Sequence, residues 1–152
     1  MKSINHLLSE YGESHQNPKN KTIHFVCVPL IFFSIVGLLY NIKLTCVFEV
    51  EITIAHVVLI LVAIYYFLLS ISIAVGMILF AALCIMLCYT IEQSVGHLFI
   101  IATIIFILAW IAQFYGHDIE GKKPSFLKDV QFLLIGPAWI MSFLFRKAGI
   151  SI

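Results

Sequence analysis

Long stretches without charge dominate the pattern of apolar and polar positions in this chain. Residues 54–91 are 38 positions without an acidic or basic side chain other than one histidine, about twice the roughly 20 residues that one membrane crossing needs. This stretch must fold back on itself. Ser70–Ser72 is the expected bend, because small hydroxylated residues can satisfy freed backbone groups, and Gly76 permits a tight helix approach. With two further apolar runs, the pattern predicts four spans, over residues 25–40, 54–69, 73–90 and 98–115.

The two ends of the chain carry weaker patterns. Ile4, Leu7, Leu8 and Tyr11 recur on one helical face after a possible cap at Ser3 or Asn5, which predicts a short amphipathic helix at the membrane interface. Near the other end, residues 130–145 form an apolar stretch with Gly136-Pro137 in its middle. This fifth segment can cross thinly, kink or re-enter the same side, and the sequence leaves the choice open.

Between the amphipathic helix and the first span, Asn17-Pro18 is expected to end the former and Asn20 to cap the latter. The predicted fold class is therefore all-α. It is a polytopic membrane helix bundle with four spans, a fifth short Pro-kinked or re-entrant helix, and an N-terminal amphipathic helix.

Composition agrees with a membrane protein and narrows the possible partners. Hydrophobic residues make up 62% of the chain and charged residues 11%, values outside the usual range for soluble domains. No linker divides residues 1–152, so we expect a single integral-membrane domain. A net charge of +1 offers no basic face for phosphates, which excludes nucleic acid as a partner.

The count of crossings predicts which histidines can meet. If four spans separate the two ends, His117 returns to the membrane face that carries His15 and His24. His56 and His97 then open the second and fourth spans at the opposite face, where we expect them to pair with each other or with Glu92. The first face also holds most lysines, which predicts a cytoplasmic location for it and for the N-terminus. These lysines are Lys2, Lys19, Lys21, Lys122, Lys123 and Lys128.

Ionisable side chains at a bilayer edge are costly unless they are paired, hydrated or bound to a metal. His15, His24 and His117 therefore form a candidate site with Asp118 and Glu120. Imidazoles with a carboxylate suit Fe(II), Zn(II) or related ions. The residues alone are consistent with two interpretations, a shared metal ion or hydrated interfacial histidines. The choice stays open because no HExxH or similar motif is present.

Two segments, YGESHQNPKNKTIH and QFYGHDIEGKKPSFLKDVQFLLIGPAW, resemble the signature regions of the membrane 2-hydroxy fatty acid dioxygenase family, which is typified by the yeast enzyme of phytosphingosine breakdown. Between His117 and Glu120 this chain is one residue shorter than the yeast-type pattern, which makes Asp118 an alternative to Glu120. The matching positions are Tyr11, His15, Asn17, Asn20, His24, Gln113, Phe114, Gly116, His117, Glu120, Pro124, Gln131 and Pro137.

The resemblance implies an Fe(II)-dependent dioxygenase of fatty acid α-oxidation. Such an enzyme converts a long-chain 2-hydroxy fatty acid and O2 to the fatty acid one carbon shorter and CO2. The four electrons released reduce O2 fully without a further cosubstrate. The substrate's 2-hydroxyl and carboxylate are expected to chelate Fe²⁺ while the alkyl chain lies between the spans.

The resemblance also implies roles for individual residues. His15, His24 and His117 would be the metal ligands, and Glu120 and Asp118 catalytic carboxylates. Asn17, Asn20 and Gln113 would orient the imidazoles by hydrogen bonds. Lys122 and Lys123 would draw the acid toward the metal, or simply hold lipid phosphates.

Two other functions stay open on the residues alone. A zinc-dependent membrane lipid hydrolase would use the same ligands, because Zn(II) activates water. A non-enzymatic membrane protein would keep its histidines hydrated at the interface. Substrate chain length and oligomeric state do not follow from the sequence.

Overall fold

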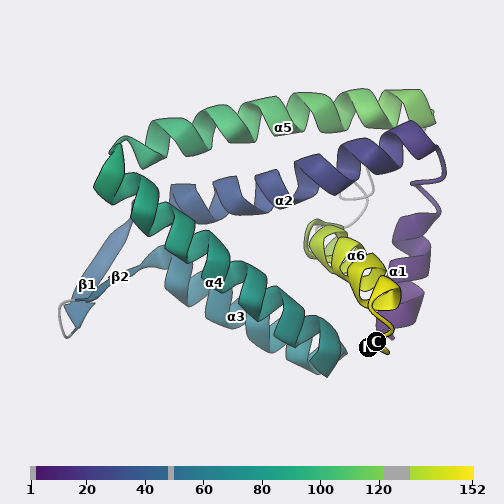
Figure 1. Cartoon of the computed structure of the whole chain (residues 1–152), viewed down its shortest axis with the longest axis horizontal. Coiled ribbons are helices and arrows are strands. Elements are labelled where there is room, and N and C mark those ends of the chain that lie inside the picture. Colours follow the sequence, from purple (N-terminus) through teal and green to yellow (C-terminus); the bar gives the residue numbers. More distant parts are fainter. Residues whose placement is uncertain (1–2, 48–49, 122–130) are drawn as a thin grey trace.

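The computed structural model describes residues 3–47, 50–121 and 131–152. Helices make up most of this part of the chain, as predicted, but a two-stranded antiparallel hairpin between the first two long helices was not predicted (Figure 1). The elements in order are α1 (Ile4–Gly12), α2 (Pro18–Tyr40), β1 (Lys43–Val47), β2 (Val50–Thr53), α3 (Ile54–Leu69), α4 (Ile71–Ser94), α5 (Leu98–Glu120) and α6 (Gln131–Lys147).

The hairpin corrects the all-α prediction at one place. Its strands pair Lys43 with Thr53 and Cys46 with Glu51, in a segment rich in β-branched residues, which favour extended backbone. The Lys43 ammonium also lies 2.7 Å from the Glu51 carboxylate across the two strands. The segment is too short and too charged to count as a span, and the hairpin lets the chain turn back outside the apolar helices.

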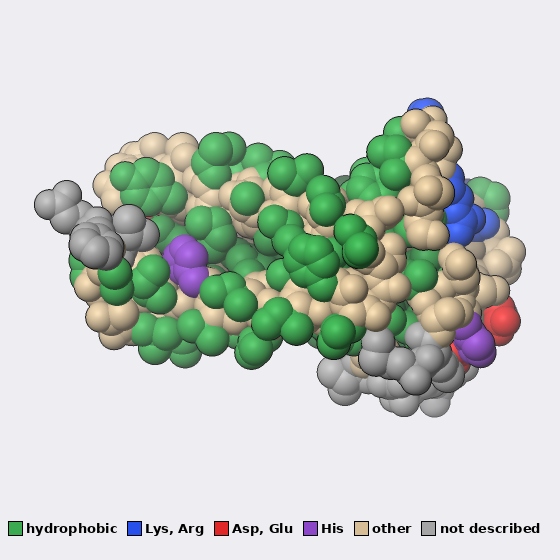
Figure 2. Space-filling view, turned by 90° about the horizontal axis from the view of Figure 1, so that it is seen from below, with side chains coloured by type: hydrophobic (Ala, Val, Ile, Leu, Met, Phe, Trp, Pro, Cys, Tyr) green, Lys and Arg blue, Asp and Glu red, His purple; other side chains and the backbone are tan. Residues whose placement is uncertain are grey.

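Three helices of the described residues, α2, α4 and α5, are long and apolar enough to cross a membrane. α3 has only 16 residues, so the four-span count stays a prediction. The predicted bend is confirmed, because α3 ends at Leu69 and α4 begins at Ile71. Ser70 between them is extended, and its hydroxyl accepts a hydrogen bond from the Ile73 N–H. Figure 2 shows hydrophobic side chains over the body of one face and charged side chains gathered at one end.

The start of α2 differs from the prediction in a way that matters for the site. Asn17 caps this helix, since its side-chain oxygen accepts from the Lys19 N–H at 2.9 Å, and Pro18 occupies the first turn, where its missing N–H costs nothing. The predicted cap at Asn20 was wrong. Asn20 lies inside the helix and is fully buried. α5 likewise continues beyond the predicted end at residue 115, to Glu120.

α2 and α5 run side by side in opposite directions, and α3 and α4 form a second antiparallel pair that crosses them obliquely (Figure 1). α1 and α6 lie together at the end where α2 begins and α5 finishes. The fifth segment thus packs into this end of the bundle as a helix with Pro137 inside it. It is not among the described helices that are long and apolar enough to cross.

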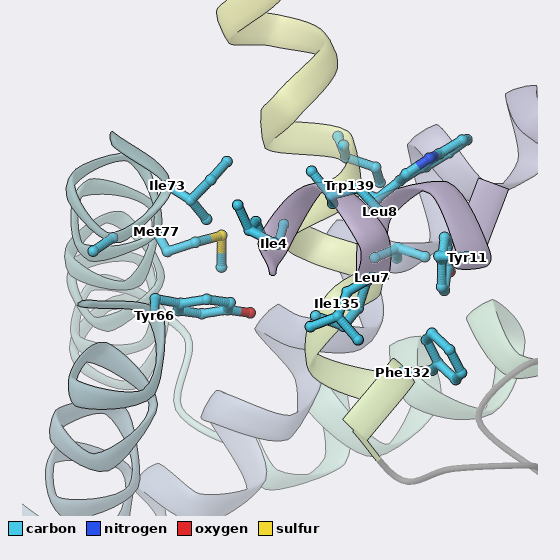
Figure 3. Packing of buried hydrophobic residues seen from close by; sticks show 14 residues of the cluster. Ile4, Leu7, Leu8, Tyr11, Tyr66, Ile73, Met77, Phe132, Ile135 and Trp139 are labelled. Atoms are coloured by element: carbon cyan, nitrogen blue, oxygen red, sulfur yellow. The ribbon is translucent and has the colours of Figure 1, made fainter. Parts of the chain in front are cut away.

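A hydrophobic cluster holds α1 and α6 against the α3–α4 pair (Figure 3). Ile4 and Leu7 of α1 meet Ile135 of α6, and Tyr66 of α3 donates its hydroxyl hydrogen to the Leu134 carbonyl at 2.6 Å. The predicted apolar face of α1 is buried against α6; its place at a membrane interface stays a prediction. Gly76 permits the close approach of α4 to α6, because a Cβ there would lie 2.6 Å from Phe145.

Candidate metal centre

Three histidines from separate elements meet at the end of the bundle that α1 and α6 cover. His15 lies in the turn between α1 and α2, His24 in the second turn of α2, and His117 in the last turn of α5. Their exposed fractions are 0%, 2% and 5%. One ring nitrogen from each lies within 4.8 Å of the others. The structure therefore brings together the three residues that the count of crossings places on one face.

The close packing of α2 and α5 sets the distance between His24 and His117. Gly116 precedes His117, and a Cβ at this position would lie 2.5 Å from Asn20 Oδ1 and 3.3 Å from Ile23 Cγ2, both on α2. Only a glycine leaves room for this approach. The rings of His24 and His117 are consequently 4.9 Å apart between centroids and perpendicular.

The orientation of His15 follows from a contact within its own turn. Its Nδ1 lies 2.6 Å from the Tyr11 carbonyl oxygen, and a carbonyl only accepts, so Nδ1 carries the proton. Nε2 therefore keeps its lone pair, and it is buried with no hydrogen-bond partner. Burial also lowers the pKa of His15 to about 4. At neutral pH this side chain is an uncharged imidazole with a free lone pair, the form that binds metals.

Tyr11 contacts two of the three histidines. Its ring stacks on His15, with centroids 4.2 Å apart and planes at 15°, and its hydroxyl lies 3.3 Å from His24 Nδ1. His24 Nε2 is then a second buried nitrogen without a hydrogen-bond partner. Burial raises the pKa of Tyr11, so the phenol stays protonated. Tyr11 belongs to the family pattern, but no role is predicted for it from the sequence, although its i, i+4 spacing to His15 could have indicated one.

The donor set fits a metal ion. An unpaired buried polar atom is costly, and a shared ion would satisfy both Nε2 atoms at once. For zinc, two nitrogen ligands each about 2.1 Å from the ion lie at most about 4.2 Å apart, so small side-chain movements would close the observed cluster. Neither Asp118 nor Glu120 belongs to the group of described donor atoms close enough to share an ion.

Glu120 instead holds the turn that carries His15. Its Oε1 accepts from the Gln16 N–H at 2.8 Å. Its Oε2 accepts from the Asn17 N–H at 2.9 Å and from the Asn20 side-chain amide at 3.0 Å. The carboxylate thus ties the end of α5 to the first turn of α2, where the helix dipole favours a negative charge. Asp118 is exposed. The catalytic roles of both carboxylates stay predictions.

The remaining predicted residues lie in several places. Asn20 and Gln113 are buried, and Gln113 lines a cavity with His24 and His117. Lys122 and Lys123, predicted to bind substrate, lie outside the described residues. Trp139 of α6 was missed; its ring is 5.5 Å from that of His15, a contact that depends on how α6 packs.

His56 lies in the first turn of α3 and His97 directly precedes α5; among the described residues, no hydrogen bond or ion pair joins them to each other or to Glu92 as expected. His56 Nδ1 lies 2.9 Å from the Thr53 hydroxyl and helps to cap α3. Glu92 accepts a hydrogen bond from the Leu98 N–H at the start of α5. His97 has a left-handed backbone conformation, with φ of 59°.

Comparison with known proteins agrees with the family resemblance. A family described as "2-hydroxy-palmitic acid dioxygenase Mpo1-like" matches residues 1–148. The chain is 32% identical over 142 residues to the 2-hydroxy-palmitic acid dioxygenase MPO1 of Saccharomyces cerevisiae, a match that covers 91% of this chain and 78% of that protein. No solved structure matches the chain.

Proposed function

The chain belongs to the Mpo1-like 2-hydroxy-palmitic acid dioxygenase family, and on this premise we propose that it is an Fe(II)-dependent dioxygenase of fatty acid α-oxidation. The substrate would be a long-chain 2-hydroxy fatty acid. Together with O2 it would give the fatty acid one carbon shorter, CO2 and water, so that the four electrons lost by the acid are those that O2 gains. The observation that carries the proposal is the buried triad of His15, His24 and His117.

Iron, when bound, would supply the open coordination positions and the redox chemistry that the two reactants need. The protein residues would hold and shield this centre. Tyr11 orients His15 and His24, the Glu120 carboxylate fixes the turn that carries His15, and burial keeps bulk water away from the imidazoles. These tasks require no titration of the residues.

Gln113 is suited to recognise the head of the substrate. It is buried, its side-chain oxygen has no hydrogen-bond partner, and it lines the same cavity as His24 and His117. A 2-hydroxyl group placed there would supply the missing donor. A non-hydroxylated acid would leave the amide oxygen unpaired, and a buried polar group without a partner discriminates strongly against such a ligand.

Metal analysis separates the proposed function from its two alternatives. We expect anaerobically purified protein to contain about one Fe²⁺ per chain and to consume O2 with 2-hydroxypalmitate but not with palmitate. Zinc without O2 uptake would instead indicate the membrane lipid hydrolase. A protein that binds neither metal would indicate a non-enzymatic role.

Substitution of the triad tests the ligands. We expect His15→Ala, His24→Ala and His117→Ala each to lose iron and O2 uptake, because two imidazoles hold an ion far less tightly than three. His6→Ala is the matched control on the exposed face of α1. His97→Asn is the control at the far end of α5, with asparagine chosen because it tolerates the left-handed backbone. Iron retained in all three triad variants would refute this ligand set.

A further inference from the structure

One cavity begins at His24 and His117 of the histidine triad and leads away from them. Its volume is about 230 Å³, far above the roughly 30 Å³ that a water molecule occupies in the liquid. The polar groups of the lining gather at one end, where Tyr11, His24, Gln113 and His117 meet. The cavity is therefore large enough for a ligand and has a polar head region.

The rest of the cavity is apolar and elongated. Along α2 its wall runs from Val28 through Ile35 to Leu39, and α3 contributes Val62, Val58 and Ala55 in antiparallel order. His24 and Leu39 are 15 residues apart on one helix, which is about 22 Å at 1.5 Å per residue. One leaflet of a bilayer holds its acyl chains in about 15 Å, half of a hydrocarbon core of about 30 Å. The cavity is thus long enough for an extended long acyl chain.

The shape of the bundle narrows this cavity at the end away from the histidines. α2 and α3 converge toward the β-hairpin and diverge toward α6 (Figure 1). At the narrow end, Ala55 and Leu39 belong to the cluster that packs α3 against α2. At the wide end, residues around Pro137 of α6 cover the polar head region. A chain that enters beside the histidines would therefore meet the packed contact of Ala55 and Leu39.

We propose that this cavity is the acyl site, which binds the alkyl chain with the carboxyl head at the histidines and the methyl end near Ala55 and Val58. These two residues of α3 would set the longest chain accepted. The identity of the head group as a 2-hydroxy acid rests on the proposed function. The binding of an apolar chain does not rest on the proposed function, because the apolar lining favours burial of any methylene group. A bilayer lipid fits less well, since its headgroup would have to enter the buried triad.

Two adjacent valines of α3 provide a matched pair of variants. Val58 lines the cavity, whereas Val57 is 43% exposed and does not line it. Val58→Phe would fill the deep end, and Val57→Phe adds the same bulk on the outer face. We expect Val58→Phe to lower kcat/KM for 2-hydroxystearate and 2-hydroxypalmitate by roughly tenfold or more. The value for 2-hydroxydodecanoate should stay within about twofold of wild type, as should all values for Val57→Phe.

A binding measurement keeps this test separate from the proposed activity. Trp110 lines the cavity, so a stearic acid brominated in mid-chain should quench its fluorescence in the full-length protein in detergent, and Trp110→Phe should remove most of the quenching. Unlabelled 2-hydroxy acids should displace the probe. Val58→Phe should weaken displacement of the probe by the longest acids. This weakening should appear even if the wild-type protein consumes no O2. Absence of O2 uptake would refute only the proposed activity.

Two outcomes would overturn the acyl site itself. The first is that Val58→Phe leaves kcat/KM unchanged for every acid, or lowers it equally for every acid, and that Val57→Phe gives the same result. The second is quenching that Trp110→Phe does not reduce. Either result would place the alkyl chain outside this cavity.

Discussion

Tyr11 uses the two halves of its side chain for two different histidines. The ring stacks on His15, and the hydroxyl lies 3.3 Å from His24 Nδ1. A hydrogen bond to the distal nitrogen of a metal-binding histidine fixes the ring and its tautomer, and losing it typically costs about 10- to 100-fold in metal affinity. Tyr11 is therefore a positioning residue in the proposed centre.

Tyr11→Phe separates these two contacts. The substitution keeps the stacked ring and removes the hydroxyl, so we expect iron affinity to fall by about tenfold while thermal stability stays near wild type. Competition with a chelator measures the affinity apart from activity. Tyr66→Phe removes another buried tyrosine hydroxyl, one that donates to the Leu134 carbonyl, and should cost about 1 kcal/mol of stability without changing iron affinity. Equal losses of iron in both variants would contradict the positioning role.

Glu120 acts on His15 through the backbone. Its three hydrogen bonds hold residues 16, 17 and 20, and hydrogen bonds to a charged group contribute about 1.5–3 kcal/mol each. Glu120→Gln keeps the size but removes the charge and brings an N–H group against N–H donors.

We expect Glu120→Gln to weaken iron binding by about tenfold or more and to lower thermal stability, because the turn that carries His15 loosens. Asp118→Asn changes an exposed carboxylate two residues away and should alter neither quantity. If instead Asp118→Asn abolished O2 uptake with iron still bound, Asp118 would be the catalytic carboxylate that the family pattern allows.

At the scale of the elements, the contact between α2 and α5 determines whether the triad can form. Gly116→Ala would place a Cβ 2.5 Å from Oδ1 of the Asn20 side chain, which is fully buried and held by its hydrogen bond to Glu120. We expect the two helix ends to separate and the protein to lose iron, measured in the purified membrane protein. Gly12→Ala is the matched control, since its Cβ would make an ordinary contact 3.5 Å from Trp139. Full iron content in Gly116→Ala would show that α2 and α5 can accommodate the added methyl group without disrupting the triad.

The sequence predicted the apolar helices well because their length and the small residues between them are local properties. The bend at Ser70 is one example. The start of α2 was misplaced by three residues because Asn17 and Asn20 are equally good caps on propensity. The contacts of Asn20 with Glu120 and with Gly116, about 100 residues away in the chain, explain why Asn20 is buried within the helix.

Tertiary contacts also explain what was missed at the site. The histidines could be grouped by counting crossings, which needs no side-chain geometry. The contribution of Trp139 depends on the packing of α6 against α1, and no local pattern encodes that packing. The hairpin was overlooked because its strands, Lys43–Val47 and Val50–Thr53, are short and lie beside far stronger apolar signals.

Across the whole molecule, the histidine triad and the β-hairpin lie at opposite ends of α2 and α5 (Figure 1). His97, which caps the start of α5, and His117 are 20 residues apart, or about 30 Å, which equals the hydrocarbon thickness of a typical bilayer. The hairpin and the triad should therefore face opposite sides of the membrane, with the triad on the cytoplasmic side if the lysine distribution sets the orientation.

The cysteines of this chain make that topology testable. Cys27, Cys84 and Cys88 are buried, and Cys46 in the hairpin is exposed, so a membrane-impermeant maleimide should modify wild type at Cys46 alone. In sealed inside-out vesicles we expect no modification until the membrane is permeabilised. Lys19→Cys in a Cys46→Ser background places the thiol at an exposed position beside the triad, and it should react at once in the same vesicles. Modification of both positions from one side would mean that α2 does not cross, and the histidines would then meet for a reason other than an even number of traversals.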